Sequence, residues 1–231
     1  VAGVDYVLHN FDAGHPVFNG LEPERLVRLQ VYTDDALRWE HKTWDVCRLY
    51  HRGGRTLFQP WGTNLLAEEF LDPVWNPLAR DCSFVGAIWD DGGLGNVGMI
   101  AQLTAALRAR GLRFDHRTQV SDAELIQAVR RSRIAPAFAG PWQVEHNYLP
   151  CRCFKHPSYG VLAVTNVRRF REVFDGCCVA GDSIPELVDA ALSLTASQYL
   201  EMTREQAKIV AARFTYRESL EAIARAFEEG R

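Results

Sequence analysis

Two cations, Arg152 and Lys155, stand three positions apart in the segment CRCFKHPSYGVLAVTN, which runs from Cys151 to Asn166. On a helix this spacing puts both side chains on one face, one turn apart. A guanidinium supplies paired donors and an ammonium supplies a point charge, so together they suit a diphosphate. Their neighbours are cysteine, phenylalanine, proline and tyrosine, which predicts partly buried cations that need an anion. A solvated cationic face on an ordinary helix stays open as the alternative.

A second candidate is the glycine-rich stretch FVGAIWDDGGLGNVGMI, in which a strand is predicted to end at Gly86 and a helix to begin near Asn96. The free N–H groups at a helix start attract phosphate, and glycines let the backbone approach it closely. The stretch has no Gly-Lys-Ser/Thr sequence and no clean dinucleotide-binding fingerprint. A turn that needs glycine for its backbone angles therefore remains an equal interpretation.

Two loops offer further polar and aromatic groups. In AGPWQVEHNYLP, Trp142 and Tyr148 can stack on a base, and Glu145 or His146 can bond a sugar, although a packed loop with aromatic anchors is the alternative. The N-terminal LHNFDAGHP contains His9, Asp12 and His15 after a predicted strand, and a histidine beside an aspartate can serve as a general base. A metal site there is disfavoured because the loop has one carboxylate, and ordinary polar loop residues remain an alternative.

Composition narrows the class of protein. The 231 residues are 47% hydrophobic and 24% charged, with a net charge of -3, which fits a globular chain and disfavours a duplex nucleic-acid binder. The sequence contains no apolar run long enough for a transmembrane segment and no basic start followed by an apolar signal segment. We expect a cytoplasmic protein with reduced, buried cysteines. Cys151 and Cys153 lack the second ligand pair of a zinc site.

The elements that position these groups alternate from Cys82 onward. Strand-like runs are 82–89, 112–117, 133–139, 159–166 and 176–181, and helical runs are 96–111, 121–132, 167–174, 183–195, 198–213 and 216–228. Ser121 and Glu124 form a capping-box pattern, and Pro136 indicates a sheet edge or a strand end. This alternation predicts an α/β fold with a parallel sheet and helices on both faces. The loops after Val85, Ala137 and Val164 would then share one rim, at the carboxyl ends of the strands.

The first third differs in pattern. The segment 4–12 reads as a strand followed by a polar loop, and 55–65 reads as a strand that leads into a Pro/Gly turn. The segment 22–54 between them reads as mostly helical, with an interruption near Val31. The sequence WGTNLL at 61–66 resembles a helix start capped by Thr63 or Asn64. The two prolines of LDPVWNPLARD indicate a linker, and this places a domain boundary near 72–80.

Taken in order, LHNFD, RLQVYTDDA, WGTNL, FVGAIW with the later GN, and CRCFKHPSYGVLAVTN resemble a GT-B-fold glycosyltransferase of the spore-maturation-type, family-one-like group. The likeness covers most of the chain. It implies two Rossmann-like domains that face each other across a cleft. Residues 1–75 would be the last, partial portion of an N-terminal acceptor-side domain, which implies a truncated chain. Residues 80–215 would bind the nucleotide sugar, and 216–231 would form a helix that packs back on the N-terminal part.

The resemblance also implies roles for individual residues. Arg152 matches a cation before the donor helix, whereas Lys155 falls where many relatives keep a glutamate for the ribose hydroxyls. This departure leaves ribose recognition open or replaces it with another phosphate contact. The donor-binding candidates are Gly86, Trp89, Asn96, His146, Tyr148, Arg152, Lys155, Thr165 and Asn166, and the catalytic candidates on the acceptor side are His9 and Asp12.

The implied function is transfer of a sugar from a nucleoside-diphosphate sugar to a glycan, lipid or protein acceptor, with no cofactor and no metal. Arg152, Lys155 and helix N–H groups would stabilise the charge that builds on the leaving diphosphate. Nucleic-acid partners are not expected. A non-catalytic module that binds sugar nucleotides or glycans, a sugar-nucleotide epimerase and an unrelated α/β protein remain alternatives. The base, the sugar and the stereochemistry of transfer stay open.

Overall fold

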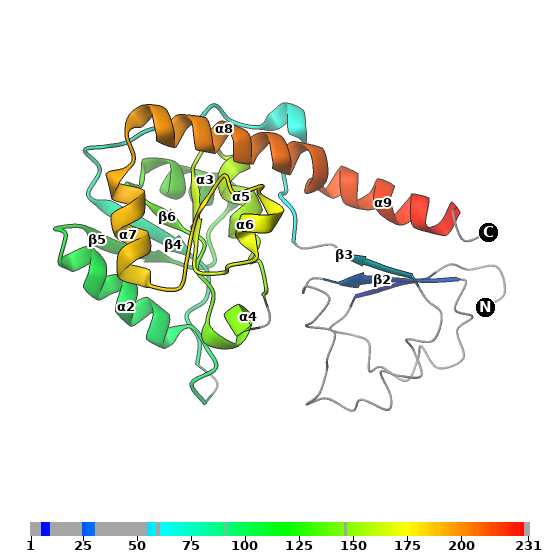
Figure 1. Ribbon diagram of the computed structural model, residues 1–231, viewed down its shortest axis with the longest axis horizontal. Coiled ribbons are helices and arrows are strands. Elements are labelled where there is room, and N and C mark those ends of the chain that lie inside the picture. Colours follow the sequence, from blue (N-terminus) through cyan, green and yellow to red (C-terminus); the bar gives the residue numbers. More distant parts are fainter. Residues whose placement is uncertain are drawn as a thin grey trace.

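The computed structural model describes residues 6–9, 25–30, 55–58, 61–90, 92–145 and 147–228. Within these ranges the chain is an α/β protein with small parallel sheets and covering helices (Figure 1), as the alternation of strands and helices predicts. No helix in these ranges is long and apolar enough to cross a bilayer.

The larger part of the fold is organised around two short sheets that share one edge. A pair, β4–β5, lies beside a three-stranded sheet, β6–β7–β8, and an isolated bridge between Cys82 and Ile134 connects them. All the pairings are parallel. The strands are β4 (Asp81–Val85), β5 (Arg113–Arg117), β6 (Ala135–Pro136), β7 (Ala163–Thr165) and β8 (Val179–Ala180).

The helices alternate with these strands and then close the chain. They are η5 (Ala67–Glu69), α2 (Val97–Arg108), α3 (Asp122–Arg131), α4 (Pro141–Glu145), α5 (Arg152–Ser158), α6 (Phe170–Val173), α7 (Ile184–Ser193), α8 (Ala196–Arg213) and α9 (Tyr216–Glu228). The capping box is confirmed, because the Ser121 side chain accepts a hydrogen bond from the Glu124 N–H and the Glu124 carboxylate accepts one from the Ser121 N–H. The sequence interpretation of 139–150 as a loop missed the short α4.

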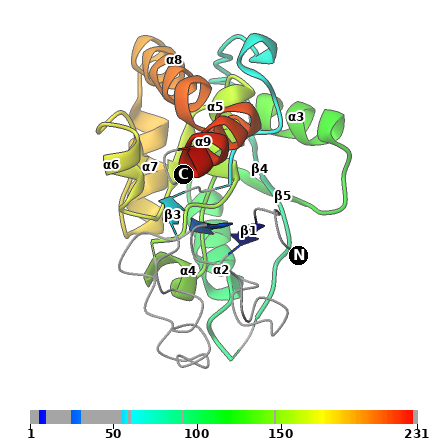
Figure 2. The ribbon, with the colours of Figure 1, turned by 90° about the vertical axis from the view of Figure 1, so that its right-hand side faces the viewer.

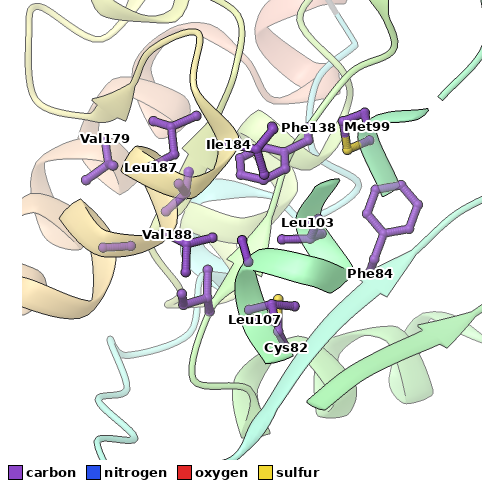
Figure 3. Close-up of a cluster of buried hydrophobic side chains, with 14 of the residues drawn as sticks. Cys82, Phe84, Met99, Leu103, Leu107, Phe138, Val179, Ile184, Leu187 and Val188 are labelled. Carbon is purple, nitrogen blue, oxygen red and sulfur yellow. The ribbon is translucent and has the colours of Figure 1, made fainter. Parts of the chain in front are cut away.

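Alternation along β7 divides the core between the two faces of the sheet. Successive strand residues point to opposite faces, and Val164 packs in a cluster with α2 and α7 while Ala163 packs in a cluster with α5 and α8. Figure 3 shows the first cluster, to which β4 contributes Phe84, α2 contributes Leu103 and α7 contributes Val188. The second face carries alanines, which leave room for the rings of Phe154 and Phe214, whose centroids are 4.8 Å apart.

Pro136 ends the edge strand of the three-stranded sheet. Strand β6 pairs with β7 on one side and approaches β4 on the other, through the Cys82–Ile134 bridge. Pro136 thus ends β6, which is the edge strand of the order β6–β7–β8, so the sequence interpretation of a sheet edge or a strand end is confirmed. Proline has no N–H to donate to a second neighbouring strand, which suits this edge position, and the Ala137 N–H still donates to the Val164 carbonyl of β7 at 2.7 Å.

The N-terminal strands form a separate parallel sheet in the order β1–β2–β3, with bounds Tyr6–His9, Leu26–Gln30 and Arg55–Phe58. The helix predicted over 22–54 is wrong at β2. The five-residue run LVRLQ is too short for its period to separate helix from strand, and parallel pairing on both sides settles it as a strand. Residues 31–54 lie outside the described ranges. Helix α9 lies beside β2 and β3 (Figures 1 and 2).

The helix start predicted at 61–66 is also wrong. Thr63 forms a bridge with Thr215, and its buried hydroxyl lies 2.6 Å from that of Ser158. These long-range contacts leave Thr63 unable to cap a helix, and only the short η5 follows. Residues 72–80 form no helix or strand, as expected of the linker.

Candidate anion-binding site at the strand ends

The guanidinium of Arg152 joins two loops that leave the carboxyl ends of neighbouring strands. It donates hydrogen bonds to the carbonyl of Val85 (Nη1 to O, 3.3 Å) and to that of Phe138 (Nη2 to O, 2.8 Å). Its central carbon lies 4.5 Å from the centre of the Phe84 ring. We call this place, formed by the loops after β4, β6 and β7, the rim. The sequence predicted that these loops meet, and Arg152 is the side chain that connects the first two.

The charge of Arg152 has no carboxylate partner among the described residues. Its Nε atom is buried and makes no hydrogen bond, and burial lowers the pKa of its guanidinium. The nearby Cys153 thiol and Tyr148 hydroxyl do not supply a negative charge that would balance Arg152. Burial raises the pKa of both groups and keeps them neutral at neutral pH. Three carbonyl or ring contacts do not cancel a full charge. A bound anion would do so.

Gly86 makes room for that guanidinium. Its φ of 149° lies in the region that favours glycine, and a Cβ atom there would stand 2.8 Å from Nη1 of Arg152. The Gly86 N–H donates to the Arg117 carbonyl at 3.0 Å, and its own carbonyl lies 2.8 Å from Nε2 of His116. The strand therefore has to end in a glycine for Arg152 to reach Val85.

The loop after β4 is shaped from within by Asn96. Its Oδ1 accepts a hydrogen bond from the Trp89 N–H at 2.9 Å, and its Nδ2 donates to the Ala87 carbonyl at 2.9 Å. Because the amide is used in this way, it does not cap α2. A Cβ atom at Gly98, in the first turn of α2, would meet nothing within 4 Å. The start of α2 is thus open, and its first N–H groups can receive an anion.

The loops after β4 and β6 pack closely at Gly140, and the loop after β4 turns tightly on itself at Gly95. A Cβ atom at Gly140 would lie 2.8 Å from the carbonyl oxygen of Gly95, and one at Gly95 would lie 2.2 Å from that of Trp89. Both positions therefore require glycine. This approach holds the start of α2 at the same rim as the loop that Arg152 contacts through Phe138.

Two polar residues at the end of β7, Thr165 and Asn166, hold the loop after β6. The Thr165 hydroxyl donates to the Ala137 carbonyl at 2.8 Å. The Asn166 amide accepts from the Ala139 N–H at 2.8 Å and donates to the Ala139 carbonyl at 2.9 Å. Buried polar groups need such partners. Their side chains support the rim, and their predicted contact with donor phosphates remains a prediction.

Lys155 and His156 follow Arg152 on α5. Lys155 is half-buried one turn further along, and it forms no ion pair with any carboxylate that the structure describes. His156 is 1% exposed, and burial lowers its pKa to about 3, an effect increased by the charges of Arg152 and Lys155 and opposed by the Ala135 backbone. The neutral His156 adds no third positive charge. Sequence reasoning missed its burial, although the buried Phe154 and Pro157 on either side of the Lys155–His156 pair are a usable signal.

The remaining predicted residues divide into three groups. Tyr148 is half-buried near Arg152 and the Trp61 indole, and Trp89 is 37% exposed on the loop after β4. His9 ends β1, where only the backbone is described. Asp12 and His146 lie outside the described residues. The structure therefore brings together Gly86, Asn96, Tyr148, Arg152, Thr165 and Asn166 around the loops of the rim, and Lys155 follows one turn later on α5.

The cysteines that the structure describes are not joined to one another. Cys82, Cys151, Cys153, Cys177 and Cys178 are free thiols. Cys82 and Cys153 are buried as expected, whereas Cys177 and Cys178 are only half-buried. The described part of the chain contains no group of three or more histidine, cysteine or acidic residues that could hold a metal ion.

Comparison with known proteins gives no family for this chain. No model of a known protein family matches it, and a search of curated proteins finds no relative. Its function must therefore be argued from the rim.

Proposed function

We propose that this chain is a glycosyltransferase that binds a nucleoside-diphosphate sugar at the rim. The observation that carries the proposal is the Arg152 guanidinium, which is partly buried without a carboxylate where two strand loops meet. Ligands of parallel α/β sheets bind outside the carboxyl ends of the strands. A diphosphate is the anion whose charge and size suit Arg152, Lys155 and an open helix start together.

The same groups would stabilise the leaving group. As the bond between the anomeric carbon and the diphosphate oxygen breaks, negative charge grows on the diphosphate. Arg152, Lys155 and the first N–H groups of α2 would attract that charge at fixed positions, so that protein cations take the part a metal ion plays elsewhere. The acceptor hydroxyl forms the new bond to the anomeric carbon and loses its proton to a base. His9 and Asp12 remain the proposed candidates for that base.

A non-catalytic sugar-nucleotide module is a second candidate. Two of the three guanidinium nitrogens of Arg152 already donate to Val85 and Phe138, which suits a residue that holds loops in place for binding. Such a module would bind the nucleotide through the same rim without turnover.

Calorimetric titration with UDP, GDP and dTDP tests the binding step. We expect one nucleotide to bind wild type, with at least about tenfold weaker binding in Arg152→Gln and in Lys155→Ala, since each removes a charge-assisted contact. The exposed Arg204 of α8 gives a matched control, Arg204→Gln, which should bind as wild type does. Thermal unfolding of each variant separates lost contacts from lost folding. Binding that is equal in all the folded variants would contradict the proposal.

Turnover separates the two candidates. A transferase slowly hydrolyses its donor when water replaces the acceptor, whereas a binding module releases it unchanged. Chromatography of UDP-, GDP- and dTDP-sugars after incubation with the chain would reveal a free nucleoside diphosphate in the first case. Tight binding with no product from any donor would favour the binding module.

A further inference from the structure

The opposite edge of the sheet, where β4, β5 and β6 begin, carries a second group of arginines. We call it the basic edge and define it by Leu78, Arg80, Arg108, Arg113, Arg130 and Arg131. The Arg113 N–H donates to the Arg80 carbonyl at 2.7 Å, so the entries to β4 and β5 lie side by side. Helices α2 and α3 end there, at Arg108 and Arg131.

Several of these cations are exposed and have no ion-pair partner among the residues placed by the structure. Arg80, Arg108 and Arg131 belong to this group. Arg113 pairs with Asp81 at 2.8 Å. The basic edge therefore keeps an excess of positive charge in a chain whose net charge is -3.

Helix ends explain only part of this pattern. A cation in the last turn interacts favourably with the helix dipole, which accounts for Arg108 and Arg131. It does not account for Arg80, which lies in the linker before β4. Arg130 has a structural role, because it donates to the carbonyls of Asp72 (2.9 Å) and Tyr159 (2.6 Å).

An apolar side chain stands out among these charges. Leu78 is 91% exposed, and it borders a hollow of about 620 Å³ whose wall includes Trp75, Arg130 and Arg131. In Figure 1 the linker between η5 and β4, which carries Leu78, runs on the side of the molecule away from the N-terminal strands. An isolated exposed leucine needs no explanation, but one that shares a hollow with the unpaired Arg131 and precedes Arg80 by two residues has the surroundings of an interfacial anchor.

We propose that the basic edge binds the surface of an anionic lipid bilayer. Unpaired arginines suit phosphate headgroups, and Leu78 can enter the boundary between headgroups and acyl chains. A nucleic acid would use the same cations but would gain nothing from Leu78. The nearby Trp75 ring offers a nucleic-acid base no free face on the side of Arg133, because the Arg133 guanidinium lies 4.4 Å from the centre of that ring. The inference does not rest on the proposed function of the rim.

Sedimentation with vesicles tests this directly. The full chain is mixed with vesicles of phosphatidylcholine alone or with about one third phosphatidylglycerol, at low salt. We expect binding only to the anionic vesicles. Arg80→Glu/Arg131→Glu should weaken it by more than about twentyfold, at about fivefold or more for each arginine near the surface. Leu78→Ser should weaken it about tenfold, since it removes the buried apolar area.

Matched controls keep the result interpretable. Arg204→Glu changes an exposed arginine of α8, and Leu220→Ser changes a leucine of α9 that is 67% exposed. Both should bind as wild type does. The proposal is overturned if the wild type ignores anionic vesicles, or if the controls lose as much binding as the basic-edge variants. Binding to a labelled duplex that depends on Arg80 and Arg131 but not on Leu78, without vesicle binding, would replace the bilayer with a nucleic acid.

Discussion

The rim and the basic edge both present arginines, yet their surroundings give these cations different properties. At the rim, Arg152 is fixed over Phe84 by two carbonyls and loses much of its contact with water. At the basic edge, Arg80 and Arg131 are exposed and point at no carboxylate in the described ranges. A buried cation selects an anion of one shape at one place. Exposed cations attract any negative surface, and salt screens them.

Removal of one arginine from each region should give the largest difference between them, measured as the change in the free energy of unfolding. Arg152→Ala leaves the Val85 and Phe138 carbonyls without their donor and opens space beside Phe84, so we expect the free energy of unfolding to fall by about 2–4 kcal/mol. Arg131→Ala removes an exposed side chain and should change it by less than about 0.5 kcal/mol. Urea denaturation measures both. Equal effects would show that Arg152 is not held as described.

Gly86→Ala should act through Arg152 without removing it. The new Cβ atom would stand 2.8 Å from Nη1 of Arg152, at a φ of 149° that strains any other residue. We expect a loss of about 1–3 kcal/mol in the free energy of unfolding, together with weaker nucleotide binding. Gly92→Ala, at a φ of 58° but with open space around it, is the control, which should keep nucleotide binding. If folded Gly86→Ala binds the nucleotide as wild type does, Gly86 is not needed to position Arg152 for binding.

The buried His156 predicts a pH dependence that belongs to the rim. Its pKa is about 3 in the folded chain and about 6.5 when unfolded, so below pH 6.5 the unfolded chain binds the extra proton. Stability is then full above about pH 6.5 and falls towards pH 3, by up to about 1.4 kcal/mol for each pH unit. Urea denaturation at pH 7.5 and 5.5 should show this slope in wild type and a flatter one in His156→Gln. Identical slopes would mean that His156 is not buried in its neutral form.

Salt should give the mildest contrast between the regions. An increase in NaCl from about 0.05 M to about 0.5 M shortens the screening length severalfold. Vesicle binding through the exposed arginines should fall steeply, whereas nucleotide binding through the half-buried Arg152 should fall less. Parallel sedimentation and calorimetry at both salt concentrations would measure the two slopes. If salt weakens nucleotide binding more steeply than vesicle binding, the cations of the rim are not the more buried of the two groups.

Local patterns allowed much of this fold to be predicted. The capping box of Ser121 and Glu124 depends on residues three positions apart, and the alternation after Cys82 indicates a parallel sheet whose loops meet at one rim. Such signals are contained in short segments. For Arg152 and Lys155 the spacing indicates a shared face only on condition that the segment is helical, and α5 meets that condition.

Long-range contacts were not readable in this way. The acceptors of Arg152 are 67 and 14 residues away in the sequence, and nothing in the local pattern indicates that they are carbonyls. Asn166 has the residue type of a ligand contact, yet packing turns both ends of its amide to Ala139. The prediction for β2 was wrong for the same reason. Its pairing with β1 and β3, and not the spacing of its own hydrophobic residues, decides its conformation.

The proposal that the rim binds a diphosphate is tested most directly at Gly98. This position lies in the first turn of α2 with open space around it, so Gly98→Asp and Gly98→Asn add side chains of equal size and differ by one negative charge. An aspartate there should stabilise the helix by about 0.3–1 kcal/mol while repelling a phosphate group. In calorimetric titration with the preferred nucleoside diphosphate, we predict at least about tenfold weaker binding to Gly98→Asp than to Gly98→Asn. Equal affinities in the two variants, or no binding of UDP, GDP or dTDP to the wild type, would contradict it.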